Sequence, residues 1–196
     1  MEALRIADGL WRWTAVHPSR KYWPNHEREA PEVGCIYYEA DDATVLIDPL
    51  VPAREEEDFF RHLDADVERR GLPVVILLTA DRHRRSTDEL AARYGARIGG
   101  APPTGVEEFA IEGSDERQVA YFIRPHAALV VCEVFAVDID GELRACQSPA
   151  LERPEELDAS LDHIMELPIK RLLVSHGRPV LEDAKARMAE TLARRR

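Results

Sequence analysis

The order of strand-like and helix-like segments limits the folds open to this chain. Residues 33–48 predict a β-hairpin, because two apolar runs flank a short acidic turn. A helix, a strand at residues 74–79 and a second helix follow. Short β-like segments then fill residues 106–145, and residues 154–195 predict helix, strand and helix.

This order favours an α/β (α+β) fold, a four-layer αββα sandwich in which two sheets pack face to face with helices outside. A doubly wound α/β fold would need helices between the strands of residues 106–145, and the sequence predicts none there. The length of 196 residues suits one domain over residues 1–196, without a linker or an internal repeat.

Local signals set the expected helix ends. Residues 54–70 carry apolar side chains at helical spacing, and Gly71 is expected to end that helix. Ser86 with Glu89 three residues later predicts a capping box. The last helix is expected over residues 181–195.

Charge and composition exclude several classes of partner. The net charge of −11 argues against nucleic acid, whose phosphates need a basic face. No apolar run is long enough for a membrane span, and the charged N-terminus is not a signal peptide. Cys35, Cys132 and Cys146 are too few and too scattered for a disulfide framework. A cytoplasmic protein with a small-molecule ligand is expected, and its oligomeric state stays open.

Four apolar strands end in polar residues, at Asp48, Thr79, Glu133 and His176. With the Ser-His-Gly setting of His176, these landmarks resemble the metallo-β-lactamase-fold hydrolases over most of the chain. The resemblance implies that the four strand ends meet along one edge, where the family holds its zinc ions. It implies that Asp48 supports the site, that Glu133 replaces a bridging aspartate, and that His176 is the last histidine of the family.

The zinc-binding loop of the family is altered. There, the strand ending in Thr runs into His-x-His-x-Asp-His, whereas this chain has Ala80 and Arg82 at the first two histidines. Arg84 and Arg85 stand at the aspartate and the third histidine, and Ser114 stands where a histidine of a later segment is expected.

Too few ligands remain for the zinc pair of the family. Only Glu133 and His176 match ligand positions, and His83 is one residue out of register. Zinc usually takes three or four protein ligands, so we expect no dinuclear zinc centre and no other cofactor, while a single zinc ion stays open.

The histidines allow two interpretations each. His176 is a catalytic candidate, either a general base or a histidine that anchors its loop. His83, the second catalytic candidate, faces either the site or water. The arginines on both sides favour its neutral form, and of the two interpretations the sequence favours a side chain that faces water.

Arg82, Arg84 and Arg85 are candidates to replace the positive charge of the metal and to hold an anion. The alternative, which surface statistics favour, is a solvated loop with weak ion pairs. Glu133 interrupts an apolar run, so it needs a partner, and one of these arginines is the expected one. Loss of the pairing arginine is expected to cost roughly 3–5 kcal/mol, as for a buried pair.

His17 begins a loop, His17–Pro31, that is rich in aromatic and basic residues, and it is a further ligand-binding candidate. The loop is either a substrate lid or a packed surface loop.

Two functions follow from the whole pattern. One is a divergent hydrolase of a small anionic substrate, and the other is a non-catalytic relative that binds a ligand or a partner.

Overall fold

The computed structural model describes residues 3–18, 30–114, 116–145 and 153–195. Its α-helices are α1 (Glu56–Arg70), α2 (Thr87–Tyr94), α3 (Pro154–Ile164) and α4 (Ala184–Arg195). Two 3-10 turns are η2 (Asp81–Arg84) and η3 (Arg124–His126). The strands are β1 (Ala3–Ala7), β2 (Leu10–Val16), β3 (Glu32–Glu39), β4 (Thr44–Ile47), β5 (Val74–Leu77), β6 (Arg97–Ile98), β7 (Val106–Ile111), β8 (Gln118–Ile123), β9 (Ala128–Val131), β10 (Phe135–Val137), β11 (Leu143–Ala145) and β12 (Arg171–Val174).

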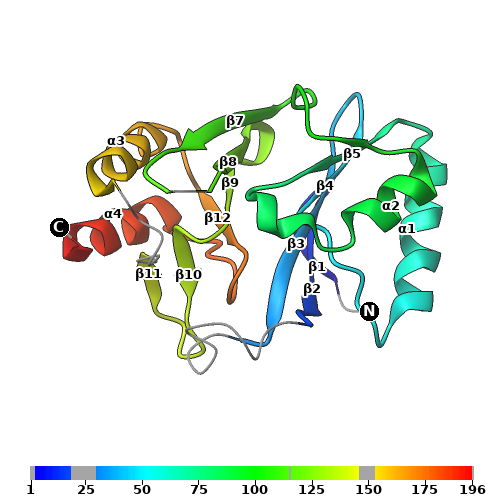
Figure 1. The fold of residues 1–196 in the computed structure, drawn as a ribbon, viewed down its shortest axis with the longest axis horizontal. Helices are drawn as coiled ribbons and strands as arrows, with labels where there is room; N and C mark the ends of the chain where they lie inside the picture. Colours follow the sequence, from blue (N-terminus) through cyan, green and yellow to red (C-terminus); the bar gives the residue numbers. More distant parts are fainter. Residues whose placement is uncertain (1–2, 19–29, 115, 146–152, 196) are drawn as a thin grey trace.

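Two sheets lie face to face between two pairs of helices, and Figure 1 shows these layers side by side. Among the described residues, β1-β2-β3-β4-β5-β6 form the N-terminal sheet and β12-β9-β8-β7 form the C-terminal sheet. Helices α1 and α2 cover the outer face of the N-terminal sheet, and α3 and α4 cover that of the C-terminal sheet. The αββα sandwich expected from the order of elements is confirmed.

Central strands are apolar on both faces, which explains why they occupy the middle of the sandwich. Along β4, Val45 and Ile47 face the opposite sheet, whereas Leu46 packs toward α1. Along β9, Val130 lies between the sheets and Leu129 packs toward α3 and α4. Successive strand residues point to opposite faces, so a strand covered on both sides needs an apolar residue at each position.

Parallel pairing brings several strand ends to one edge of the sandwich. β4 pairs in parallel with β5, and β12 pairs in parallel with β9. At this edge the chain after β12 bridges to β3 through Val33 and His176, and Gly34 donates a backbone hydrogen bond to Ser175 at 2.7 Å. A second bridge joins Ala80, after β5, to Gln118 at the start of β8. The two sheets are therefore tied together where the polar landmarks lie.

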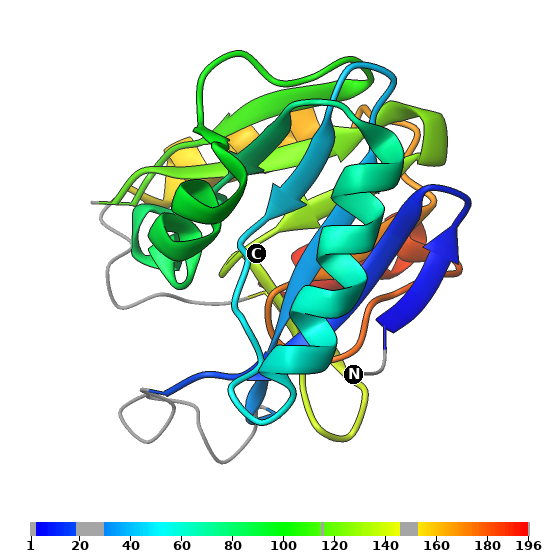
Figure 2. The same ribbon diagram turned by 90° about the vertical axis from the view of Figure 1, so that its right-hand side faces the viewer.

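Figure 2 shows α1 lying over the middle of the N-terminal sheet, with β1 and β2 extending past it. The sequence did not predict β1, which pairs antiparallel with β2. The segment has only five residues, two of them are alanines with a low strand preference, and Arg5 interrupts it, so it gives no clear strand signal. Among the described helices, none is both long enough and apolar enough to cross a membrane.

Two expected helix starts were wrong. Helix α1 begins at Glu56 rather than Arg54, because the preceding residues form a turn in which Glu55 donates to the Pro52 carbonyl at 2.9 Å. Helix α4 begins at Ala184 rather than Leu181, since Asp183 has a left-handed φ of 52°.

The expected capping box at α2 does not form. The Ser86 hydroxyl accepts a hydrogen bond from the backbone of Val51 at 3.0 Å, and no side-chain cap bond is present at this helix start. Ser86 therefore ties the loop after β4 to α2. The left-handed Gly71 does end α1 as expected, with its N–H bonded to Val67.

Candidate functional site at the strand ends

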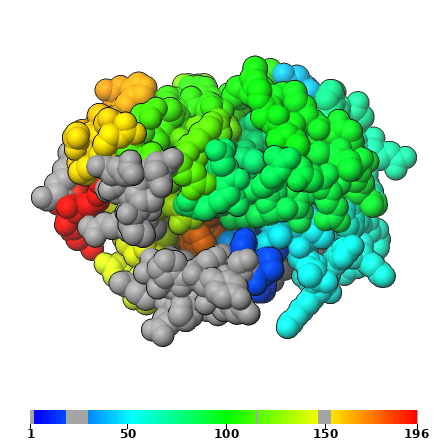
Figure 3. Space-filling model, in the orientation of Figure 1, coloured from blue at the N-terminus to red at the C-terminus, as the bar shows by residue number. Residues whose placement is uncertain are grey.

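The four polar landmarks meet at one edge. Asp48 follows β4 and accepts a hydrogen bond from the backbone N–H of Thr79 at 2.8 Å and a further one from the Thr79 hydroxyl. His176 follows β12 and lies 3.3 Å from Glu133, measured between Nε2 and Oε1. Figure 3 shows the segment after β12 (orange) reaching the surface beside green and blue parts of the chain.

His83 joins this group, which corrects the expectation that it faces water. The turn η2 directs its side chain inward, where 5% of it is exposed. Its Nδ1 lies 2.8 Å from an oxygen of Asp48, and its Nε2 lies 3.5 Å from Glu133. A buried carboxylate needs a partner, and the attraction of Asp48 for a protonated His83 outweighs the repulsion from the two flanking arginines.

Asp48 and His83 form a charged pair. Burial alone would raise the pKa of Asp48, but the adjacent His83, Arg85 and the Thr79 hydroxyl hold it below its usual value. Burial alone would lower the pKa of His83, but Asp48 and the hydrogen bond to Glu133 raise it above its usual value. The two directions agree, and they favour a carboxylate facing an imidazolium.

Glu133 is the centre of the exposed part of the site. Burial would raise its pKa, yet the hydrogen bonds from His176 and His83 hold the pKa of this carboxyl well below its usual range. The guanidinium of Arg82 lies 3.5 Å from the same oxygen. This is the ion pair expected for Glu133, and the side chains of Arg82 and Glu133 are 42% and 26% exposed.

The three arginines of the loop have different positions. Arg82 lies at the rim and also pairs with Glu116 through its side chain and its backbone N–H. Arg84 points away from the site and pairs with Asp88 on the exposed side of α2, so it does not contribute to the pocket that the sequence suggested.

Arg85 lies beneath the site. It donates to the backbone carbonyl of Asp48 at 2.8 Å, to that of Gly34 at 3.3 Å, and to the hydroxyl of Ser175 at 3.3 Å. It thus reaches the backbone of Asp48 rather than its carboxylate. Arg85 and Asp48 both have positive φ, 36° and 50°, and strained non-glycine residues of this kind often cluster at functional sites.

His17 and Ser114 are related to the strand-end site in different ways. The pKa of His17 is lowered by burial and then by the charges of Arg85, His83 and His176, so the imidazole lies within their electrostatic reach. The remainder of its loop, residues 19–29, lies outside the described residues. Ser114 accepts hydrogen bonds from the Glu116 backbone and the Gln118 side chain, and Glu116 in turn pairs with Arg82.

Sequence reasoning missed Arg12. Its side chain is buried on the inner side of β2, packs against Gly34 and donates to the Gly177 carbonyl at 2.7 Å. A signal was present, because Arg12 stands between two tryptophans in an alternating strand and must point opposite to them. Gly177 adopts a φ of 86° directly after His176, and a side chain there would clash with Val137.

Comparisons with known proteins were made for the whole chain. No protein-family model matches it, and no curated protein matches it either. Solved structures do match. A metallo-β-lactamase superfamily protein from the archaeon Sulfolobus tokodaii gives a TM-score of 0.65 at 17% identity, with 95% of this chain and 85% of that chain covered.

Two further solved structures agree. A fragment described as a diflavin flavoprotein from Nostoc sp. gives a TM-score of 0.64 at 14% identity, covering 98% of this chain and 95% of that chain. A metallo-β-lactamase from Pontibacter korlensis gives 0.58 at 14% identity, with 98% of each chain covered. The chain has the metallo-β-lactamase fold. At these identities the likeness establishes the fold alone.

The residues present do not fit the zinc pair associated with this fold. Zinc is held by His, Cys and carboxylate side chains, whereas a guanidinium remains protonated and offers no lone pair. Arg82 and Arg85 stand at expected ligand positions, and His83 is already bonded to Asp48. Within the described part of the chain, no group of three or more His, Cys, Asp or Glu side chains is arranged to hold a metal ion.

Proposed function

We propose that the strand-end site binds a small anionic ligand through arginine and histidine side chains rather than through a zinc pair. Its charged members are Asp48 and Glu133 on one side and Arg82, His83 and Arg85 on the other. Guanidinium and imidazolium groups can supply fixed positive charge where this fold otherwise uses metal ions.

The observation that carries this proposal is the convergence of Arg82, His83 and His176 on one oxygen of Glu133, at 3.5, 3.5 and 3.3 Å. The environment of His17 agrees with it. After burial, the causes that lower its pKa are the charges of Arg85, His83 and His176. Burial is the largest of these causes, and the positive charges of the three side chains add a local potential that attracts an anion. The chain as a whole has a net charge of −11, so its composition alone does not explain a local positive region.

Arg82 is the group that would contact the ligand. Its side chain is 42% exposed, and it is bonded to Glu116 and Glu133 at the rim. A guanidinium presents a planar fork that matches a carboxylate or a phosphate. A ligand anion would compete with Glu116 and Glu133 for this guanidinium.

Isothermal titration calorimetry with inorganic phosphate and with succinate tests this. We expect saturable binding at low salt that weakens as ionic strength rises. Arg82→Gln should weaken binding by roughly 10-fold or more, since hydrogen bonds to charged groups contribute about 1.5–3 kcal/mol. Arg84→Gln is the matched control, because Arg84 belongs to the same turn but pairs with Asp88 outside the site.

Absence of saturable binding for both anions would refute the proposal. Equal loss in the Arg82 and Arg84 variants would refute it as well, because a general change in surface charge would then explain the effect.

A second candidate is hydrolysis of a bound anion, and the contact between His176 and Glu133 favours it. Because the pKa of Glu133 is held well below its usual range, Glu133 is a weak base, and His176 is the better candidate to accept a proton from water. The structural neighbours include a metallo-β-lactamase, a hydrolase by name.

Turnover of 4-nitrophenyl phosphate and 4-nitrophenyl acetate in the presence of EDTA separates the two candidates. Turnover that His176→Gln abolishes supports hydrolysis. Anion binding without turnover supports a binding protein.

A further inference from the structure

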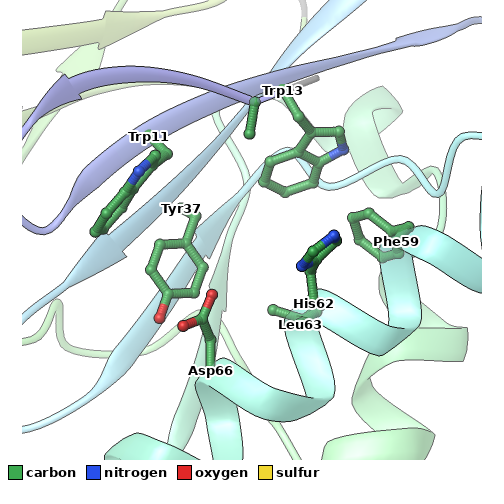
Figure 4. A pocket seen from close by; sticks show the side chains of 8 residues that line it. Trp11, Trp13, Tyr37, Phe59, His62, Leu63 and Asp66 are labelled. Atoms are coloured by element: carbon green, nitrogen blue, oxygen red, sulfur yellow. The ribbon is translucent and has the colours of Figure 1, made fainter. Parts of the chain in front are cut away.

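A cavity of about 320 Å³ lies on the opposite face of the N-terminal sheet from the strand-end site. Its walls come from β1, β2, β3 and α1, and Figure 4 shows the side chains around it: Trp11, Trp13, Tyr37, Phe59, His62, Leu63 and Asp66. Ligand pockets usually span about 300–1,000 Å³, so this cavity has room for a small molecule.

The sequence pattern explains why the cavity forms. Trp11 and Trp13 are two residues apart on β2, so both point to the face covered by α1, and Tyr37 is the cross-strand partner of Trp11. Ala3 of β1 lies opposite Trp13, and its small side chain leaves space at the end of the sheet. Helix α1 does not extend over β1, as Figure 2 shows.

Aromatic rings form most of the wall. Trp11 and Tyr37 meet edge to face with their ring centroids 5.5 Å apart, and Trp13 packs against Phe59 at the same centroid distance. Aromatic faces carry partial negative charge, which attracts a cation, and several rings around one cavity favour quaternary ammonium groups.

A carboxylate completes the wall. Asp66 follows Phe59 and Leu63 along one face of α1, and Figure 4 places its carboxylate beside the Tyr37 ring. Its side chain is 44% exposed, and among the described residues its hydrogen bonds come from Arg69 and both reach Oδ1. Glu39 accepts a hydrogen bond from the Tyr37 hydroxyl at 3.1 Å, so a second acidic group lies near the same ring.

The electrostatics of Tyr37 agree with this arrangement. Burial raises its pKa first, and the negative charges of Asp66 and Glu39 raise it further. Burial is the largest cause, and the charge of Arg69, which pairs with both carboxylates, acts the other way, so the carboxylates supply the part of this shift that also attracts a cation.

We propose that this cavity binds a small quaternary ammonium cation, with the rings of Trp11, Trp13 and Tyr37 around the methylated head group and Asp66 supplying the opposite charge. Quaternary ammonium is preferred over a primary ammonium, because the cavity offers aromatic faces rather than several hydrogen-bond acceptors. The strand-end site carries the opposite potential, so the two sites would take ligands of opposite charge.

Choline and its uncharged counterpart 3,3-dimethylbutanol form the test, because they have the same shape and differ in the charge of the head group. Binding to the full chain is followed by tryptophan fluorescence and by calorimetry. We expect saturable binding of choline and roughly 10-fold weaker binding of 3,3-dimethylbutanol, in line with the strength of cation–π contacts.

Two substitutions on the same helix provide the matched comparison. Asp66→Asn removes the charge at the cavity, and Asp58→Asn removes an aspartate that pairs with Arg61 at the same spacing but does not line the cavity. Asp66→Asn should weaken choline binding several-fold, and Asp58→Asn should leave it unchanged. Equal binding of the two ligands, equal effects of the two substitutions, or no saturable binding of choline would each overturn the proposal.

Discussion

Replacement of His83 by leucine tests whether the buried pair stabilises the site. His83 and Asp48 side chains are each 5% exposed, and their closest atoms are 2.8 Å apart. Removal of one partner from a buried pair costs about 3–5 kcal/mol, because the other charge stays buried without compensation. Asp48 keeps two hydrogen bonds from Thr79, so we expect the low end, about 3 kcal/mol.

The sign of the pH dependence follows from the pKa directions. The raised pKa of His83 means that its contribution to stability is complete below its unfolded value, near 6.5, and is lost as pH rises through the folded value. The lowered pKa values of Asp48 and Glu133 mean that their contributions are complete above their unfolded values, about 4, and are lost as pH falls through the folded values. The network is therefore most stabilising between about pH 4.5 and 6.5.

Urea unfolding at pH 6 and pH 9 measures the effect. We expect His83→Leu to lower the free energy of unfolding more at pH 6 than at pH 9, because the parent loses the contribution of the charged His83 as pH rises through its folded pKa. Asp48→Asn is the second variant, and the double variant completes a mutant cycle whose coupling energy should fall toward pH 9. An equal penalty at both pH values, or no penalty, would refute the charged pair.

Three further predictions concern the arginines and the metal. Arg82→Ala should cost only about 1 kcal/mol or less in chemical unfolding, since its pair with Glu133 is partly exposed, and a loss of 3 kcal/mol would contradict this. Gly34→Ala should destabilise by roughly 1–3 kcal/mol, because a Cβ there would lie 2.8 Å from the Arg12 guanidinium carbon, and Arg12→Ala should remove most of that penalty. Metal analysis after dialysis should not find two zinc equivalents per chain, and a pair lost on His176→Gln would show the opposite.

The position of the strand-end site could be predicted from the sequence, whereas its composition could not. Each landmark follows an apolar run, and the carboxyl ends of parallel strands meet at one edge, which places Asp48 beside Thr79 in one sheet and His176 beside Glu133 in the other. His83 could not be placed this way. Its direction depends on the turn η2 and on a carboxylate 35 residues earlier, whereas its sequence neighbours are charged and suggest solvent.

Arg12 shows the same limit. Alternation with the two tryptophans fixes the face on which it lies, but its acceptor on Gly177 is 165 residues away in the chain. The cost of burying a guanidinium without a partner predicts that an acceptor exists, and only the tertiary structure identifies it.

Arg85 shows which task of a metal ion an arginine can replace in this fold. One guanidinium bonds to the backbone of Gly34 in β3, to that of Asp48 after β4, and to Ser175 after β12. Metal ligands join strand ends in a comparable way, so Arg85 supplies the cross-link and the positive charge together. A guanidinium cannot act as a Lewis acid or activate a bound water as zinc does, because it has no open coordination position. The hydrolysis proposed above would therefore use carboxylate and imidazole side chains, and the contact that it uses is that of His176 with Glu133.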